Sequence, residues 1–246
     1  MASNKDQSKA SKLIFAPGEA PPDSAQPTSQ QAAQFNVGAL NRDDLDADPF
    51  QQFHKWFSDP ALKGTVPETV TLSTAELPSG KVSSRMVYLK ELDDRGWVIY
   101  SNWGTSRKAR DVESNPYASL CFWWKPLERQ VRVEGPCERL TSEESQVYYD
   151  TRARGSRIGA WASQQSSGLQ PNGSSGDDGR AQLEQQVRDV EKKFEGVDNI
   201  PVPDFWGGLR VKPEMVEFWQ GRESRLHDRF KYTRDGNGWE IERLNP

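Results

Sequence analysis

The densest group of side chains that could do chemistry lies near the C-terminus, in residues 217–229. Phe218 and Trp219 favour burial, and Gly221 allows a turn into a run that holds three arginines and His227. Like charge on both sides should lower the pKa of this histidine and keep its imidazole neutral at about pH 7. A neutral imidazole there could accept a proton or a hydrogen bond beside an anion. A solvated surface loop is the alternative interpretation of the same composition.

A second group has the pattern of a phosphate site at a helix start. Ser106 is suited to be a helix N-cap, and Arg107 and Lys108 follow it at once. The free N–H groups at a helix start favour a nearby anion, and two cations there are unfavourable without one. The pattern therefore indicates a bound phosphate or, alternatively, an exposed start of a surface helix.

A third group, Tyr148, Arg152 and Ser156, is spaced by four and four residues. On one helix these residues would line one face, where a phenol, a guanidinium and a hydroxyl could all donate to one phosphate. Gly155 could end that helix early and shift Ser156. The alternative is a solvated helix face.

Arg85 and Lys90 lie in one predicted strand with opposite parity, so a regular strand would point them to different faces. They would then serve two ligands, unless a bulge brings them together. Gln130 and the pair Gln165-Ser166 add further polar groups. Together these groups are too many for one small ligand, and they predict two phosphorylated molecules side by side, a cofactor and a substrate. No nucleophile elbow, Walker loop or Rossmann glycine pattern is present.

The elements that must position these residues are short strands with hairpin-like turns, interrupted by helices. Such a pattern predicts a mixed α+β class, in which an antiparallel sheet closes into a barrel with peripheral helices. The predicted strands cover residues 69–74, 82–90, 97–101, 119–124, 130–138, 205–211, 215–220, 230–233 and 239–244. One predicted helix begins with Asp48 as its N-cap. Three others cover residues 106–114, 142–154 and about 183–194.

The chain divides into a tail and one domain. Residues 1–47 are rich in Ser, Gln, Ala, Pro and Asp, a composition that cannot bury enough apolar surface to offset chain entropy, so we expect a disordered tail. Residues 48–246 would form the domain, with a mobile Gly/Ser-rich insertion at about 166–179.

The overall composition excludes several classes of protein. A net charge of −4 argues against a general nucleic-acid binder, and no apolar run is long enough to span a membrane. Signal-peptide and transit-peptide characters are absent, so we expect a cytoplasmic location. Cys121 and Cys137 form no Cys/His cluster, and we interpret them as reduced core residues and expect no metal site.

The ordered set of motifs resembles the pyridoxamine 5'-phosphate oxidase family, flavin enzymes of vitamin B6 metabolism. The resemblance covers residues 48–246. Ala153 and Arg157 depart from it, because the family more often has proline and glutamine there, and the insertion is longer than usual. The matching motifs are RMVYLK (85–90), SRKA (106–109), LERQV (127–131), IGAW (158–161), QS (165–166), FWGG (205–208), EFWQG (217–221), RLHDR (225–229) and ERLNP (242–246).

The resemblance implies an FMN-binding split β-barrel that works as a homodimer with FMN at the interface. It implies the oxidation of pyridoxamine 5'-phosphate and pyridoxine 5'-phosphate by O2 to pyridoxal 5'-phosphate, with H2O2 as a product and NH3 from the amine. Arg225 and His227 would be catalytic and would stand over the substrate ring. The substrate phosphate would be bound by Lys90, Tyr148, Arg152 and Ser156. FMN would be bound by Arg85, Met86, Val87, Tyr88, Tyr100, Ser101, Arg107, Lys108, Gln130, Gln165, Ser166, Trp219 and Arg229.

Two alternative functions are compatible with these residues. One is a related split-barrel flavoprotein that acts on another substrate. The other is a protein that stores or delivers FMN or pyridoxal phosphate without turnover, since binding and catalysis would use the same residues.

Overall fold

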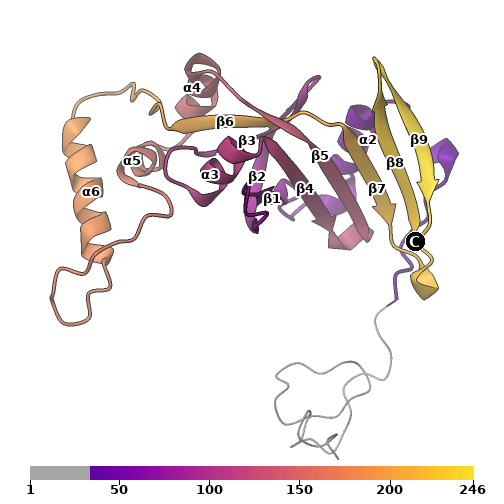
Figure 1. Cartoon of the computed structure of the whole chain (residues 1–246), viewed down its shortest axis with the longest axis horizontal. Helices are drawn as coiled ribbons and strands as arrows, with labels where there is room; N and C mark the ends of the chain where they lie inside the picture. The colour runs from indigo at the N-terminus through magenta and orange to yellow at the C-terminus, as the bar shows by residue number, and fades with distance from the viewer. Residues whose placement is uncertain (1–33) are drawn as a thin grey trace, which may run out of the picture.

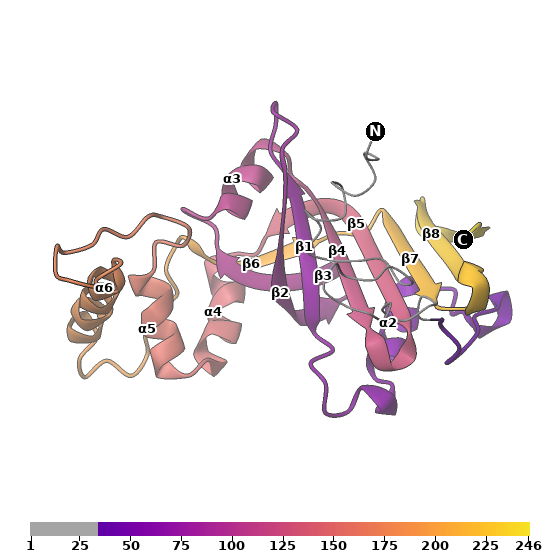
Figure 2. The ribbon, with the colours of Figure 1, turned by 90° about the horizontal axis from the view of Figure 1, so that it is seen from below.

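The computed structural model describes residues 34–246, and its centre is an antiparallel barrel (Figures 1 and 2). The strand order is β4-β1-β2-β3-β6-β5-β7-β8-β9, and β4 also pairs with β5, so that six strands close on themselves. The predicted α+β class with an antiparallel barrel is therefore confirmed. The elements are η1 (Arg42–Asp44), α2 (Pro49–Phe57), η2 (Pro60–Leu62), β1 (Thr69–Ala75), β2 (Val82–Asp93), β3 (Gly96–Asn102), α3 (Arg107–Ser114), β4 (Tyr117–Trp124), η3 (Lys125–Leu127), β5 (Arg129–Arg139), α4 (Ser142–Thr151), α5 (Arg154–Ala162), α6 (Arg180–Lys193), β6 (Trp206–Val211), β7 (Met215–Gln220), η4 (Glu223–Arg225), β8 (Asp228–Asp235) and β9 (Gly238–Leu244).

The barrel interior is filled by side chains that alternate along the strands, together with one face of α2. In β1, Val70 and Leu72 are fully buried and their neighbours are not. The side chain of Asp48 caps α2 by accepting the N–H of Phe50, as the predicted helix start requires. Phe53 of this helix then packs against aromatic rings of β3 and β4. The packed core therefore keeps the strands that carry the predicted site residues rigid.

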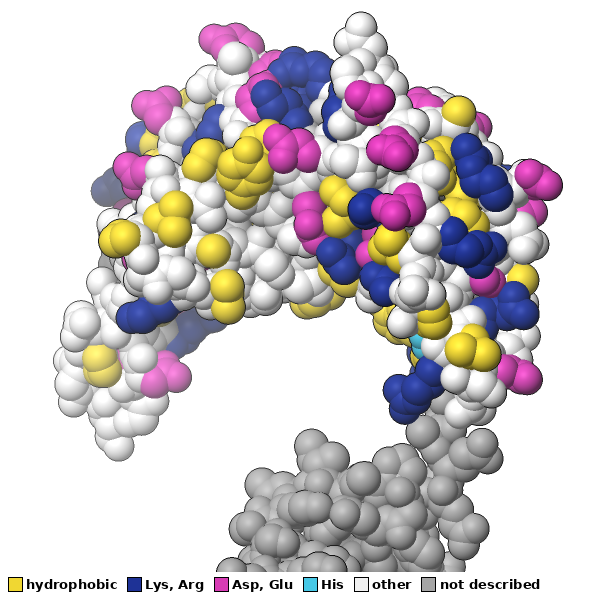
Figure 3. All heavy atoms as spheres, turned by 45° about the vertical axis from the view of Figure 1, so that its right-hand side comes forward, with side chains coloured by type: hydrophobic (Ala, Val, Ile, Leu, Met, Phe, Trp, Pro, Cys, Tyr) yellow, Lys and Arg dark blue, Asp and Glu magenta, His cyan; other side chains and the backbone are white. Residues whose placement is uncertain are grey.

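The two ends of the molecule carry different elements. Helices α4, α5 and α6 lie at one end, and strands β7, β8 and β9 extend the sheet at the other (Figures 1 and 2). Between these ends the described part of the chain curves into an arch that is hollowed on one side (Figure 3). The predicted site residues are divided between the two ends.

The helix predicted over residues 142–154 is wrong in one respect, because it ends early and a second helix follows. Helix α4 ends at Thr151, Arg152 has an extended backbone, and α5 begins at Arg154. Tertiary contacts explain the break, since the Arg152 guanidinium lies over the Trp206 ring and the Tyr149 hydroxyl donates to the Arg157 carbonyl. Ser156 therefore reaches the same site from a separate helix.

The predicted tail boundary also needs correction. Residues 34–47 pack on the domain, although residues 1–33 lie outside the described residues. Leu40 is buried and its N–H donates to the Asp228 carboxylate, while the Tyr232 hydroxyl donates to the Asp46 carbonyl. The composition of this segment did not reveal it, because the polar groups that satisfy its backbone belong to distant strands.

The segment between α5 and α6 contains turns and neither helix nor strand over residues 163–179. Its predicted mobility stays a prediction. Within residues 34–246, no helix is long and apolar enough to cross a membrane. The same residues contain no group of three or more His, Cys, Asp or Glu side chains that could hold a metal ion. Cys121 and Cys137 are free, partly buried thiols.

Candidate functional site

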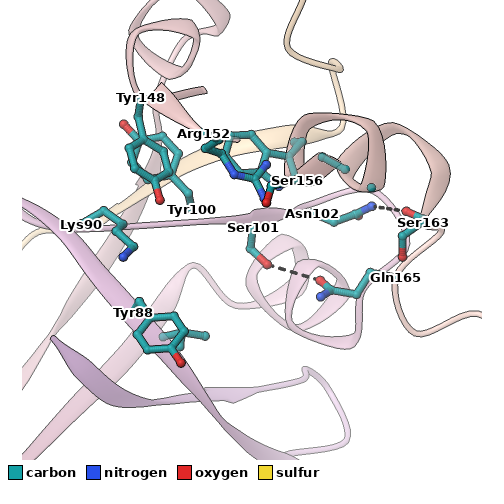
Figure 4. A pocket seen from close by; sticks show the side chains of 14 residues that line it. Tyr88, Lys90, Tyr100, Ser101, Asn102, Tyr148, Arg152, Ser156, Ser163 and Gln165 are labelled. Atoms are coloured by element: carbon teal, nitrogen blue, oxygen red, sulfur yellow. Dashed lines mark hydrogen bonds between the residues drawn. The ribbon is translucent and has the colours of Figure 1, made fainter. Parts of the chain in front are cut away.

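A cavity of about 460 Å3 opens at the helical end of the barrel, between β2, β3, α4 and α5 (Figure 4). It brings together most of the predicted phosphate-binding residues and several of the predicted FMN-binding residues. The predicted residues that line it are Val87, Tyr88, Lys90, Tyr100, Ser101, Tyr148, Arg152, Ser156 and Gln165.

One wall of this cavity is an aromatic stack that fixes a guanidinium. The Tyr100 ring lies 4.2 Å from Tyr148 and 5.5 Å from Trp206, between ring centroids. The Arg152 guanidinium carbon lies 4.6 Å from the Trp206 ring centroid, a cation–π contact. Nη1 of Arg152 is buried and has no hydrogen-bond partner among the described residues. A buried N–H donor without an acceptor favours an anion in this place.

Lys90 points into the same space from β2 and Ser156 from α5 (Figure 4). Burial lowers the pKa of the Arg152 guanidinium, and the neighbouring phenols of Tyr148 and Tyr149 act in the opposite direction. Two cations and two hydroxyl groups thus converge on one cavity. This donor set fits a phosphate.

A third cation lies beside the cavity at the start of α3. Lys108 is 6% exposed, and its Nζ donates to the Gln165 side-chain oxygen at 2.6 Å. Gln165 also accepts a hydrogen bond from the Ser101 hydroxyl, at 3.3 Å. Burial, followed by the charge of Arg85, lowers the pKa of Lys108 to about 8. No carboxylate pairs with Lys108 in the described chain, so an anion at this helix start would stabilise its charged form.

Arg85 and Lys90 serve different surfaces, as their parity predicts. The side chain of Arg85 donates to the Leu72 carbonyl and to the Thr74 hydroxyl, at 3.1 and 2.8 Å, and does not line the cavity. The ladder between β2 and β3 shifts register between Leu89 and Glu91, so a bulge does occur next to Lys90. It does not bring the two cations together.

Strands β5, β7 and β8 and the loop before β8 carry five other predicted residues, Gln130, Trp219, Arg225, His227 and Arg229. Gln130, Trp219 and Arg229 are cross-strand neighbours in register on β5, β7 and β8. The His227 ring lies 4.4 Å from the Trp219 ring, between centroids. Arg229 is already engaged, because its Nε and Nη2 donate to the two carboxylate oxygens of Glu217, at 2.9 and 3.1 Å.

His227 has the neutral state that the sequence predicts. Burial is the largest cause that lowers its pKa, followed by the charges of Arg225 and Arg229, while Asp228 raises it. The sequence predicted the effect of like charge but not the effect of burial. Nδ1 accepts the Arg222 N–H at 3.1 Å, which leaves the proton of a neutral ring on Nε2. His227 can therefore donate a hydrogen bond to a ligand.

Arg225 lies in a tight turn at η4. Its φ is 62° and that of Ser224 is 56°, so two consecutive non-glycine residues adopt left-handed backbone. Such a conformation persists only where surrounding contacts hold it, and it occurs more often at functional sites. The guanidinium of Arg225 is exposed, as are Met86 and Ser166, which line no part of the cavity.

Two site residues were missed by the sequence analysis. Phe35 lies edge-on against His227 and Trp219, with ring centroids 5.7 and 5.6 Å away. An aromatic residue within an otherwise polar tail was the available signal. Asp111 pairs with Arg107 and Arg85 and is fully buried. Its only sequence signal is its position four residues after Arg107.

The sequence matches two family models. Residues 61–194 match the model described as pyridoxamine 5'-phosphate oxidase. Residues 206–246 match the model described as the pyridoxine 5'-phosphate oxidase C-terminal dimerisation region.

Two fungal proteins are similar to this chain over most of its length. The chain is 49% identical to a probable pyridoxamine 5'-phosphate oxidase of Schizosaccharomyces pombe, over the whole of both chains. It is also 49% identical to a pyridoxamine 5'-phosphate oxidase of Saccharomyces cerevisiae, over 87% of this chain and 92% of the relative.

The fold is shared with solved structures. PhzG of Burkholderia lata, solved with tetrahydrophenazine-1-carboxylic acid, is 28% identical, with a TM-score of 0.74 over 85% of this chain and 99% of its own. An FMN-binding protein of Nostoc punctiforme related to pyridoxamine 5'-phosphate oxidase shares the fold, with a TM-score of 0.59 over 81% of this chain and 98% of its own at 17% identity. From these matches, the chain belongs to the pyridoxamine 5'-phosphate oxidase family.

Proposed function

We propose that this protein oxidises pyridoxamine 5'-phosphate and pyridoxine 5'-phosphate to pyridoxal 5'-phosphate. Oxygen is the electron acceptor and becomes H2O2, and the amine also consumes water and releases NH3. One observation carries the choice of a phosphorylated substrate. Arg152, whose Nη1 is buried and has no hydrogen-bond partner among the described residues, lines a cavity together with Lys90, Tyr148 and Ser156. We assign these four residues to the substrate phosphate.

FMN is the cofactor of this reaction. When bound, it supplies the redox chemistry by taking two electrons from the substrate and passing them to oxygen. Lys108 and Arg107, at the start of α3, and Arg85 next to them fit its phosphate, because no carboxylate among the described residues pairs with the buried Lys108. The other residues assigned to FMN are Met86, Val87, Tyr88, Tyr100, Ser101, Gln130, Gln165, Ser166, Trp219 and Arg229.

We further propose that the complete site forms between two copies of the chain. The loop between β7 and β8, which carries Arg225 and His227, lies at the opposite end of the molecule from helices α4 and α5 of the cavity (Figure 1). If these two residues act on the ligand of the cavity, a second copy must supply them. The outward side chains of β2 include Met86 at 62% and Tyr88 at 54% exposure, an apolar surface that a partner could cover. A match to a dimerisation region supports the same assembly.

Arg225 and His227 act on the substrate ring in this proposal. The Arg225 guanidinium orients the substrate and polarises its leaving group. His227 donates from Nε2, because its Nδ1 is engaged by the Arg222 N–H. Holding the reacting carbon about 3 to 3.5 Å from its acceptor accounts for much of the rate in such a site.

Two free thiols are compatible with a reducing compartment, and we propose a cytoplasmic location.

An absorbance experiment tests the function. The purified protein should be yellow, its band near about 450 nm should bleach on anaerobic addition of pyridoxamine 5'-phosphate, and oxygen should restore the band with release of H2O2. A flavin band that does not bleach would indicate another substrate or a binding role. Protein that cannot be loaded with FMN would contradict the proposal.

The similarity to PhzG, a protein solved with a phenazine compound, gives one specific alternative, a different ring substrate. The two candidates differ in the need for a phosphate. We expect oxidation of pyridoxamine 5'-phosphate and little oxidation of unphosphorylated pyridoxamine, since the charges of Lys90 and Arg152 would lack a partner. Equal rates for both would favour the alternative.

A further inference from the structure

Asp111 lies at the centre of a buried ionic network beneath the start of α3. It is 0% exposed, although Arg110 and Glu113 of the same helix are exposed. Its Oδ1 accepts from Arg107 Nε at 2.7 Å and its Oδ2 from the Thr74 hydroxyl at 2.7 Å. The Arg85 Nη2 lies 3.8 Å from Oδ2. One carboxylate therefore joins two guanidinium groups that come from different elements.

The network keeps Asp111 ionised. Burial alone would raise its pKa, but hydrogen bonds from Thr74 and Arg107, together with the charges of Arg107 and Arg85, lower the pKa below its ordinary value. The carboxylate is thus a fixed negative charge at physiological pH. An isolated buried carboxylate is costly, so this one persists because its partners compensate it.

The same contacts restrict the two arginines. Arg107 uses Nε for Asp111, which leaves its two terminal nitrogens facing away from the carboxylate. One of them reaches Glu76 at 3.5 Å, and that carboxylate is half-buried. Arg85 is held at Nη1 by Thr74, whose hydroxyl in turn donates to Asp111. Each guanidinium is therefore fixed by the Asp111–Thr74 pair.

We infer that Asp111 is a positioning residue for cofactor binding, which holds the guanidinium groups of Arg85 and Arg107 in the orientation that receives the FMN phosphate. This inference rests on the proposed function, which assigns those arginines to FMN. Pre-oriented donors lose less conformational freedom when a ligand binds, and a fixed fork matches phosphate oxygens better than a mobile one.

The direction in which FMN affinity changes when Asp111 loses its charge distinguishes a positioning role from charge repulsion alone. A carboxylate near a bound phosphate repels it, so removal of the negative charge would by itself strengthen FMN binding. If orientation dominates, the same removal weakens FMN binding. Asp111→Asn keeps the size of the side chain and removes the charge, and it therefore distinguishes the two effects.

The experiment compares FMN with riboflavin, which lacks only the phosphate. Full-length protein is freed of flavin, and each ligand is titrated by the quenching of its fluorescence. We expect Asp111→Asn to bind FMN about tenfold more weakly, the loss of one charge-assisted hydrogen bond, and riboflavin within about twofold of wild type. The matched control is Glu76→Gln, whose carboxylate touches Arg107 from the half-exposed side, and it should retain FMN affinity within about twofold.

Each other outcome is decisive. An equal loss for both flavins in Asp111→Asn would mean a structural role only, and unchanged or tighter FMN binding would mean that orientation does not matter; either result overturns the inference. Wild-type protein that binds FMN and riboflavin equally would overturn the proposed phosphate site itself. If Asp111→Asn does not fold, Thr74→Val loosens the same pair and should lower the ratio of FMN to riboflavin affinity in the same direction.

Discussion

The guanidinium of Arg152 lies over the ring of Trp206, and its Nη1 is buried without a hydrogen-bond partner among the described residues. The indole fixes the plane of the guanidinium. Its unpaired N–H group can donate a hydrogen bond to an anionic ligand. Trp206 comes from β6 and Arg152 from the end of α4, so the barrel itself orients this donor.

Arg152→Lys tests this orientation. Lysine keeps the charge but loses the planar fork and the stacking on Trp206. We expect the KM for pyridoxamine 5'-phosphate to rise about tenfold while kcat changes less, because uniform binding is lost. Arg188→Lys on the exposed α6 is the control and should leave both constants unchanged. An unchanged KM for Arg152→Lys would remove Arg152 from the phosphate site.

His227 predicts a definite pH dependence. Its pKa is lowered, first by burial and then by two arginines. The ring is therefore neutral when the pH lies above the ordinary pKa of histidine. Activity that needs the neutral ring is fully present above about pH 6.5 and is lost as the pH falls through the lowered pKa. The pH profile of kcat should therefore show this acid limb in wild type and lack it in His227→Ala.

A pair of amide variants separates the two ring nitrogens. Asparagine can replace Nδ1 as the acceptor of the Arg222 N–H but cannot replace Nε2, whereas glutamine places an N–H near the Nε2 position. We expect His227→Asn to lower kcat about tenfold to a hundredfold and His227→Gln to lower it less. The reverse order would show that the loop contact, and not the distal N–H, is what the reaction uses.

The sequence predicted the strands well and the local helix breaks poorly. The strand over Met215–Gln220 has the predicted bounds, because alternation and turn residues are local signals. The break at Arg152 depends on a ring in β6, and the packing of Leu40 depends on Asp228. Such contacts join distant residues, and a spacing of four cannot reveal them. The buried position of Asp111 could not be predicted for the same reason, since its partners Arg85 and Thr74 come from β2 and β1.

We expect Arg229 to have two roles, one in stability and one in FMN binding, that a single substitution would confuse. Its guanidinium pairs with Glu217, whose side chain is 4% exposed. Arg229→Ala therefore leaves a buried carboxylate whose remaining ion-pair partner in the described part of the chain is Arg132, at 3.4 Å. We expect it to destabilise the protein by about 3 kcal/mol and to release FMN. The double variant Arg229→Ala/Glu217→Gln should regain much of the stability in thermal unfolding without regaining FMN affinity. Full FMN occupancy in both variants would exclude Arg229 from the cofactor site.

A site shared between two copies makes a quantitative prediction for mixed variants. The cavity residue Arg152 lies between α4 and α5, and the loop residue His227 precedes β8 at the other end of the molecule (Figure 1). Each complete site would therefore take them from different copies. Arg152→Ala and His227→Asn should each retain at most about a tenth of wild-type activity alone. A heterodimer of the two contains one site with both changes and one site with neither.

Random exchange of equal amounts should therefore restore about a quarter of wild-type activity, since half of the dimers are mixed and half of their sites are intact. The mixture is unfolded and refolded together, and H2O2 release is measured against each variant treated in the same way. Recovery requires exchange, so variants mixed without refolding are the control. If the refolded mixture stays at the level of the separate variants although mass spectrometry detects heterodimers, then Arg152 and His227 do not meet across an interface.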